Sequence, residues 1–396
     1  MKRRDFIKRS SLASGALLVP SFLQAFDKIG MSIFQGKRLV VIQLTGGNDG
    51  LNTVVPFQND IYYKNRRGIA LPPREIIKLN DEVGLHAGLK ELKELYDQGY
   101  LSVINNVGYP NPDRSHFRSS DIWHTASSSS EYLQTGWFGR YLDNHAERPY
   151  QGIEIDDTMS LIMKGEKING IATKNAKVLY ETSRNPYFNE LSRHQQDAHL
   201  SEHNLGYLYK TFNEAKSSAR YIYETSKTFT TKVTYPQNAF GKQLKTVSEF
   251  INSGLDTSVY YVSLGGFDTH ANQLGQQGRL LKIYAEGIKT FVEDLKANGT
   301  LNDTLIFTFS EFGRRLKQNA AGGTDHGAAN NIFIIGNKLK KQGIFNAMPD
   351  LSDLDANGDI KFNIDFRDLY ATMLEKWLQV DSERVLLGNF RPLNIL

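Results

Sequence analysis

Five short apolar runs spread along the chain constrain its fold more than any other feature. They are rich in β-branched and aromatic residues, and apolar and polar residues do not alternate cleanly within them, which is typical of strands buried on both faces of a parallel sheet. The runs are residues 38–44, 101–105, 259–264, 304–309 and 331–335. We therefore expect these segments to form the central strands of one parallel sheet.

Helical patterns lie between these runs. Leucine recurs on one helical face in residues 89–96, residues 274–296 are amphipathic, and residues 368–378 also place their apolar side chains on one face. Strands that alternate with helices predict an α/β fold with a mostly parallel sheet. Residues 185–255 interrupt this rhythm, because they are polar and mainly helical, and we interpret them as a helical insertion rather than a second α/β domain.

The composition excludes several classes of protein. Apolar residues make up 40% of the 396 residues and charged residues 23%, which rules out a disordered or low-complexity chain. Cysteine is absent, which excludes disulfide frameworks, thiol nucleophiles and cysteine-ligated zinc or iron–sulfur sites. Any metal ion must therefore be held by His, Asp, Glu, Asn or backbone oxygen atoms.

The net charge of +4 comes from the first 25 residues, which carry five basic side chains and one acidic side chain. The rest of the chain is balanced in charge and has no block rich in Lys or Arg, so we expect it not to bind nucleic acid. No run of about 18 apolar residues occurs, so the sequence predicts no transmembrane segment in the mature chain.

Residues 1–25 have the three parts of a signal peptide. A basic head with Arg3 and Arg4 precedes a weakly apolar stretch, and Ala25 offers a small residue for cleavage. The sequence around the two arginines resembles the twin-arginine consensus, which implies export of a folded, often metal-loaded protein by the twin-arginine translocase. Glycine and proline within the apolar stretch argue against the alternative, an ordinary amphipathic helix. We expect residues 26–396 to form one periplasmic or otherwise exported domain.

Three glycine-rich loops next to predicted strands carry acids and histidines. Asp49 follows the first strand, Asp268 and His270 follow the third, and Asp325 and His326 precede the fifth. Ligands of open α/β sheets bind at strand ends, and carboxylates with imidazoles suit hard or borderline divalent cations. We expect these five side chains to converge on one divalent metal centre. The alternatives are a plain turn at Asp49 and capping aspartates beside surface histidines at the other two loops.

Catalytic candidates stand in two further segments. Ser115 lies at a predicted helix start, where free N–H groups favour an anion, and Arg114 precedes it. A hydroxyl there could attack phosphorus or sulfur, or hold an oxyanion. Glu311 and Arg314, after the fourth strand, add an acid and an arginine suited to pair with an oxyanion. The alternative for Ser115 is that it only caps the helix.

Six motifs in order resemble the domain of unknown function 1501 family, a group of bacterial, usually twin-arginine-exported proteins. They are GGNDGLNTVVP (46–56), DRSHF…DIW (113–123), GGFDTH (265–270), SEFGR (310–314), GGTDHG (322–327) and DFRDLY (365–370). The family is placed by fold similarity among the alkaline phosphatase-like and sulfatase-like proteins. The resemblance therefore implies a three-layer α/β/α sandwich with a largely parallel sheet.

The resemblance also implies a chemistry. Such enzymes hold one or two divalent metals at strand ends, and a Ser or Thr at a helix start is the nucleophile. The matching metal positions here are Asp49, Asp268, His270, Asp325 and His326, and the matching nucleophile is Ser115. A zinc, magnesium, manganese or calcium ion there would lower the pKa of the hydroxyl and clamp a phosphate or sulfate ester.

Two departures from the family pattern bear on the metal centre. The enzymes often space the later Asp and His four residues apart, whereas Asp268 and His270 are two apart, and no histidine follows His326. A second metal site is therefore either incomplete or completed by Asp365 or Glu311. Three functions stay open: an exported metal-dependent hydrolase of phosphate or sulfate esters, a catalytically inactive, metal-stabilised envelope binding or assembly protein of the same fold, and a phospho- or sulfo-transferase.

Replacing Arg3 and Arg4 together by lysine should leave the protein in the cytoplasm, because the twin-arginine route reads the two guanidinium groups rather than their charge. Fractionation of cells that express wild type and double variant would measure this. Normal export of the variant would contradict the twin-arginine assignment.

Overall fold

The computed structural model of the protein describes residues 36–186 and 204–396, and residues 204–210 by their backbone alone. The predicted signal peptide and residues 187–203 of the predicted insertion lie outside the described residues. Lys37–Leu396 cluster as one compact unit. Within the described residues, no helix combines the length and the apolar character that a membrane crossing requires.

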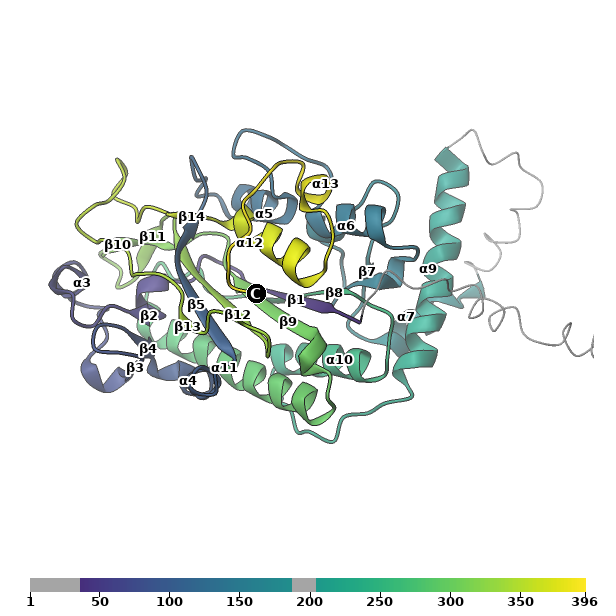
Figure 1. Ribbon diagram of the computed structural model, residues 1–396, viewed down its shortest axis with the longest axis horizontal. Coiled ribbons are helices and arrows are strands. Elements are labelled where there is room, and N and C mark those ends of the chain that lie inside the picture. Colours follow the sequence, from purple (N-terminus) through teal and green to yellow (C-terminus); the bar gives the residue numbers. More distant parts are fainter. Residues whose placement is uncertain (1–35, 187–203) are drawn as a thin grey trace, which may run out of the picture. The chain divides into compact units, whose positions relative to one another are not determined.

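The five predicted strands form the middle of one large sheet (Figure 1). Its strands are β1 (Arg38–Leu44), β5 (Leu101–Gly108), β6 (Gly152–Glu154), β7 (Ile171–Ala172), β8 (Val259–Leu264), β9 (Thr304–Phe309), β12 (Asn330–Ile335), β13 (Gly343–Ile344) and β14 (Ile364–Asp365). Their order is β13-β5-β12-β9-β1-β8-β6-β7, and β14 also pairs with β5. Three predicted strands keep their bounds, and the other two gain residues at their ends.

Strand direction differs from the prediction at one place. The pairs of this sheet are parallel, except that β12 runs antiparallel to both β5 and β9. The prediction of a parallel strand at residues 331–335 is therefore wrong. The reason is that the chain enters β12 from a short antiparallel ribbon, β10 (Arg314–Gln318) and β11 (Thr324–His326), instead of from a crossover helix. As a result, β12 begins at the edge of the sheet where β1, β8 and β9 end.

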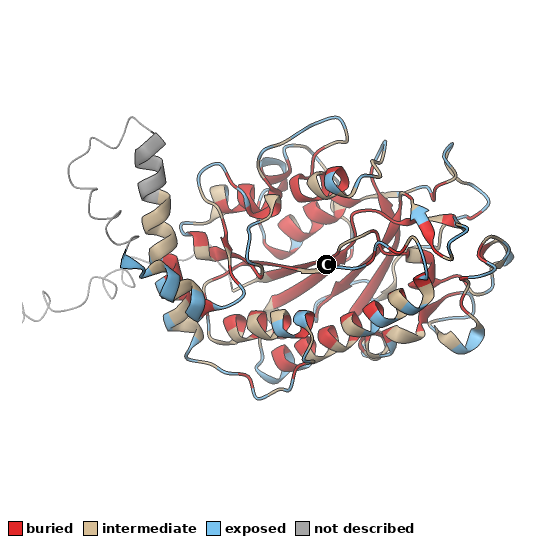
Figure 2. Ribbon diagram, turned by 180° about the vertical axis from the view of Figure 1, so that it is seen from behind, coloured by how far each residue is buried: buried red, intermediate tan, exposed pale blue. Residues whose placement is uncertain are grey.

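Helices cover both faces of the sheet. One layer holds α4 (Lys90–Asp97), α10 (Ala239–Asn252) and α11 (Gln273–Ala297), and the other holds α5 (His116–Thr125), α6 (Trp137–His145), α12 (Phe366–Thr372) and α13 (Ser382–Leu386). Along β1, Val40 and Ile42 pack into the first core, and Leu39 and Val41 into the second. Figure 2 shows the buried sides of the helices turned towards the sheet. The predicted α/β/α sandwich with a mostly parallel sheet is confirmed.

Smaller elements complete the described part of the chain. The helices are α3 (Asp60–Asn65), α7 (Ala176–Ser183), α9 (Asn204–Ser226), the 3-10 turns η1 (Gly50–Asn52), η2 (Pro73–Glu75), η3 (Ala87–Leu89), η4 (Pro149–Gln151), η5 (Leu161–Met163) and η7 (Leu301–Asp303), and the π-helical turn η8 (Met373–Trp377). A separate small sheet contains β2 (Val54–Val55), β3 (Ile76–Lys78) and β4 (Gly84–His86).

The region predicted as a helical insertion contains α9 and α10 among its described residues. α10 buries Phe240, Leu244 and Val247 in the core that also holds the sheet. It is therefore one of the helices that cover the sheet. Tyr221 of α9 packs against Tyr150, with ring centroids 4.2 Å apart.

Val40→Ala should lower the free energy of unfolding by about 2–3 kcal/mol, because it removes fully buried apolar surface from the central strand. Val178→Ala is the matched control. That side chain is 57% exposed on α7, so the same change should shift stability by less than about 0.5 kcal/mol. Urea unfolding would compare the two variants, and equal midpoints would contradict the placement of β1 in the core.

Candidate metal centre

Ligand-type side chains gather at the edge of the sheet where β1, β8 and β9 end and β12 begins. Asp268 follows β8, Glu311 follows β9, and His326 is the last residue of β11. The first turn of α5 brings His116 to the same place. This is the edge at which α/β proteins commonly bind their ligands.

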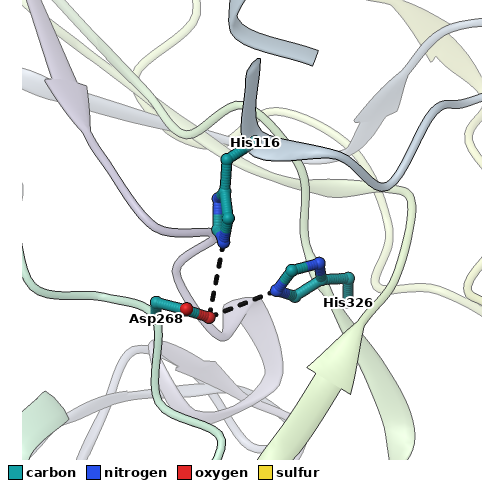
Figure 3. Close-up of side chains that lie close together, drawn as sticks. All are labelled: His116, Asp268 and His326. Atoms are coloured by element: carbon teal, nitrogen blue, oxygen red, sulfur yellow. Dashed lines mark hydrogen bonds and ion pairs between the residues drawn. The ribbon is translucent and has the colours of Figure 1, made fainter. Parts of the chain in front are cut away.

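His116, Asp268 and His326 form a cluster with the geometry of a metal site. Their ligand atoms all lie within 4.8 Å of one another. Oδ1 of Asp268 is 3.4 Å from Nε2 of His116 and 3.2 Å from Nε2 of His326 (Figure 3). Three donors thus point at one small volume from three separate segments of the chain.

Two more of the predicted residues border this cluster. Nε2 of His270 lies 3.1 Å from Oδ1 of Asp268 and 2.9 Å from Nε2 of His326. Its Nδ1 lies 3.4 Å from Oδ1 of Asp325. The structure therefore brings together four of the five predicted metal residues, and Asp325 contacts the cluster through His270.

The Nδ1 atoms of two of these histidines are held by acceptors outside the cluster. Nδ1 of His326 lies 2.7 Å from the carbonyl oxygen of Arg114, which can only accept a hydrogen bond, so this Nδ1 carries the proton. Nδ1 of His116 lies 2.9 Å from Oε1 of Glu311. A neutral imidazole held in this way presents the lone pair of Nε2, and metal-binding histidines are usually oriented by such partners.

Bonding inside the cluster is incomplete without a cation. Nε2 of His116 is buried and has no hydrogen-bond partner. The ring of Phe312 packs against both His116 and His326, with ring centroids 4.9 and 4.6 Å apart, and limits their rotation. A buried nitrogen lone pair without a donor is costly, and a divalent ion would satisfy it. The residues present therefore fit a metal ion.

Arg314 lies beneath the cluster with its side chain fully buried. Its guanidinium donates to Oδ1 of Asp268 at 2.7 Å and to carbonyl oxygens in two loops and in β11. Those carbonyls belong to Gly46, Gly47, Phe267 and Thr324. The sequence predicts that Arg314 pairs with an oxyanion, whereas the structure commits its donors to these internal acceptors.

Asp49 lies apart from the cluster, although the sequence predicts it as a ligand. Its carboxylate caps η1 by accepting from the backbone N–H groups of Leu51 and Asn52. Its other oxygen lies 2.5 Å from Nη1 of Arg66, and neither side chain of this ion pair is exposed. The buried arginine thus provides the counter-charge that the prediction assigns to a metal ion.

Ser115 is the N-cap residue of α5, and no hydrogen bond from its side chain caps the helix. It is exposed, and it stands between Arg114, whose carbonyl holds His326, and His116. The side chain of Arg114 donates through Nε to Oδ2 of Asp359, 2.8 Å away, and that carboxylate is fully buried. Ser115 therefore sits at the rim of the cluster, while the arginine before it is paired internally.

Charge within the cluster favours an ionised Asp268. Burial tends to raise the pKa of this carboxyl, but the hydrogen bond from Arg314 and its positive charge outweigh burial, and the pKa falls to about 2. The hydrogen bond to Glu311 raises the pKa of His116, and burial lowers the pKa of His326. Because the pKa of Asp268 is depressed, its ionised form stabilises the fold above about pH 4, and this contribution is lost as the pH falls towards 2.

His116 is the functional candidate that sequence reasoning missed. It directly follows Ser115 inside the motif at residues 113–123, so its place in the first helical turn could have indicated a functional histidine. Nothing in the local pattern reports that this turn lies against the loops after β8 and β9. Glu311, predicted as a catalytic acid, lies behind His116 as its hydrogen-bond partner.

Comparisons with known proteins identify a family for this chain but do not identify an activity. A family model described as "Protein of unknown function (DUF1501)" matches residues 99–390, which is most of the chain. None of the curated proteins matches the chain. Similar solved structures include the lipoteichoic acid synthase from Listeria monocytogenes, with 10% identity, a TM-score of 0.42, and coverage of 90% of this chain and 76% of that chain.

Two further solved structures show similar values. A protein in the alkaline phosphatase superfamily from Vibrio parahaemolyticus has 12% identity and a TM-score of 0.42, covering 91% of this chain and 70% of that chain. A phosphonate monoester hydrolase from Silicibacter pomeroyi has 10% identity and a TM-score of 0.41, covering 90% of this chain and 76% of that chain.

Arg314→Lys should lower the free energy of unfolding of the metal-free protein by about 2–4 kcal/mol, because lysine cannot reach all of the buried carbonyl oxygens and leaves some unsatisfied. Arg384→Lys is the matched control, since that side chain is 75% exposed and the change should cost less than about 0.5 kcal/mol. Urea titrations measure both variants. Equal stability would show that Arg314 does not organise these loops.

Proposed function

The chain belongs to the DUF1501 family, and we propose that it is an exported, metal-dependent hydrolase of phosphate or sulfate esters. One observation supports this proposal above all. His116 and His326 direct their Nε2 atoms at the Asp268 carboxylate while Nδ1 of each is held from behind, and Nε2 of His116 is buried without a hydrogen-bond partner. Side chains arranged in this way are prepared to bind an ion.

The donor set favours a borderline cation. His116, His270 and His326 offer imidazole nitrogens, and Asp268 offers a carboxylate oxygen. Imidazole suits zinc and other transition metals, whereas magnesium and calcium prefer oxygen ligands. Of the four ions that the sequence leaves open, zinc therefore fits these residues best.

The residues of the chain supply the remaining parts of a hydrolytic site. A bound divalent ion supplies a Lewis acid that polarises an ester and offsets its charge. Asp268 and the two held histidines would keep that ion at the start of α5, next to the exposed hydroxyl of Ser115. Ser115 would attack the phosphorus or sulfur atom and displace the alcohol, which takes up a proton, and water would then release the phosphate or sulfate from the serine. The N–H groups of the first turn of α5 would face the anionic group.

The internal pairing of Arg114 and Arg314 favours a second function. Arg114 is paired with Asp359, and Arg314 donates to backbone carbonyls and Asp268, so both arginines predicted as catalytic residues are occupied. This observation suits a catalytically inactive, metal-stabilised envelope protein that binds or assembles with others. In that case the ion would tie the loops together without turning over an ester.

The proposal also covers the route of export and the partners of the protein. Arg3 and Arg4 support delivery by the twin-arginine translocase to the periplasm or beyond, and the balanced charge of the remaining chain gives no support to a nucleic-acid partner.

The test combines metal analysis with hydrolysis of aryl phosphate and aryl sulfate esters by the full chain. Wild type should bind zinc and hydrolyse one class of ester. Asp268→Asn and His326→Ala should lose both properties, whereas Ser115→Ala should keep zinc and lose at least about a hundredfold in kcat. His145→Ala, a histidine of α6 outside the cluster, should keep both.

The other outcomes separate the proposals. Zinc binding without hydrolysis of either ester would support the binding or assembly protein. Full activity in Ser115→Ala would assign the attack to water, and a wild-type chain that binds no divalent ion would overturn the metal centre.

A further inference from the structure

A buried polar network lies directly behind the candidate metal centre, on the α5 face of the sheet. Gln43 of β1 points to the same face as Leu39 and Val41, where an apolar side chain would pack well, yet it is 1% exposed. It contacts Tyr261 of β8 and His124 of α5, which are also buried. Burying so many polar groups is costly unless each has a partner.

The contacts fix which way the Gln43 amide faces. Its oxygen Oε1 lies 2.9 Å from Nε2 of His124 and accepts a hydrogen bond from the hydroxyl of Tyr261. Its nitrogen Nε2 lies 3.3 Å from Oε2 of Glu311 and 3.4 Å from the hydroxyl of Ser120. A flipped amide would place an oxygen against the Glu311 carboxylate, which is repulsive, so the nitrogen faces Glu311.

Glu311 links the Gln43 amide to the cluster. Its side chain is 1% exposed, and Oε1 accepts from the backbone N–H of Gly46 at 2.7 Å and contacts Nδ1 of His116 at 2.9 Å. The amide of Gln43 contacts the other oxygen of the carboxylate. Because both carboxylate oxygens are held, Glu311 stays in one position, and there it accepts a hydrogen bond from Nδ1–H of His116.

We propose that Gln43, Tyr261 and His124 are positioning residues for the metal centre. Tyr261 and His124 orient the Gln43 amide towards Glu311. Glu311 in turn keeps His116 in the Nδ1–H tautomer and aims Nε2 of His116 at the ion. This inference rests on the proposed metal-dependent function. It assigns a role to three residues that do not touch the cluster themselves. Burial lowers the pKa of His124 to about 4, so this histidine stays neutral and keeps a single N–H for the network.

A purely structural network predicts something different. If these contacts only satisfied buried polar groups, their loss would lower stability without changing how His116 binds an ion. A second buried hydrogen bond provides the comparison, because the hydroxyl of Tyr284 contacts Oγ1 of Thr308 at 2.8 Å in the core on the opposite face of the sheet. Tyr261→Phe and Tyr284→Phe therefore each remove one buried phenolic hydroxyl together with its hydrogen bonds.

The experiment titrates the full chain with zinc and records the imidazole ¹⁵N spectrum of His116 in the zinc-free protein. Gln43→Met should weaken zinc binding by about tenfold, the lower end of the effect of groups behind a metal ligand, and Tyr261→Phe by about threefold, because it acts one contact further away. Both variants should also shift His116 towards the Nε2–H tautomer. Tyr284→Phe should change neither quantity.

Equal zinc affinities and equal His116 spectra in wild type, Tyr261→Phe and Tyr284→Phe would overturn the positioning role. Should Gln43→Met not fold, Tyr261→Phe and Tyr284→Phe decide the question. A wild-type chain that binds no zinc would contradict the metal-dependent function instead. In that case the His116 tautomer in the zinc-free variants would still show whether the network acts on this ring.

Discussion

The buried guanidinium of Arg314 is the interaction on which the candidate site depends. It donates to carbonyl oxygens in the loop after β1, the loop after β8 and β11, and it also holds Asp268. Glycine-rich loops have little side-chain packing of their own to hold them in place. A planar group with five donors can join two such loops and a strand at once, and lysine could not. The position of the Asp268 carboxylate, which the histidines of the cluster face, depends on this side chain.

Around that fixed carboxylate, each histidine of the cluster is held by a group that lies outside it. His326 is held by the carbonyl of Arg114, and His116 by Glu311. Behind Glu311, the network through Gln43 reaches into the core of the sheet. The site is thus oriented from two sides, by backbone on one and by buried polar side chains on the other, and an ion at its centre would complete its bonding.

The sequence allowed the strands and much of the site to be predicted, because both depend on local pattern. Apolar runs identified β1, β8 and β9 to the residue, and glycine-flanked acids and histidines identified Asp268 and His326. Side-chain partners from distant segments could not be predicted. Arg66, 17 residues away, neutralises Asp49, and the short β10–β11 ribbon reverses β12. His116 joins the cluster because α5 starts beside the loops after β8 and β9, a relation that no local pattern reports.

The central claim is that one divalent ion lies between His116, Asp268 and His326. Diffraction from zinc-soaked crystals of the protein, recorded on both sides of the zinc absorption edge, tests it most directly. We predict one anomalous peak within about 2.0–2.2 Å of Nε2 of both histidines and of a carboxylate oxygen of Asp268. The Nδ1 atoms should still face Glu311 and the carbonyl of Arg114. A peak elsewhere, or no peak at full zinc loading, would contradict this account.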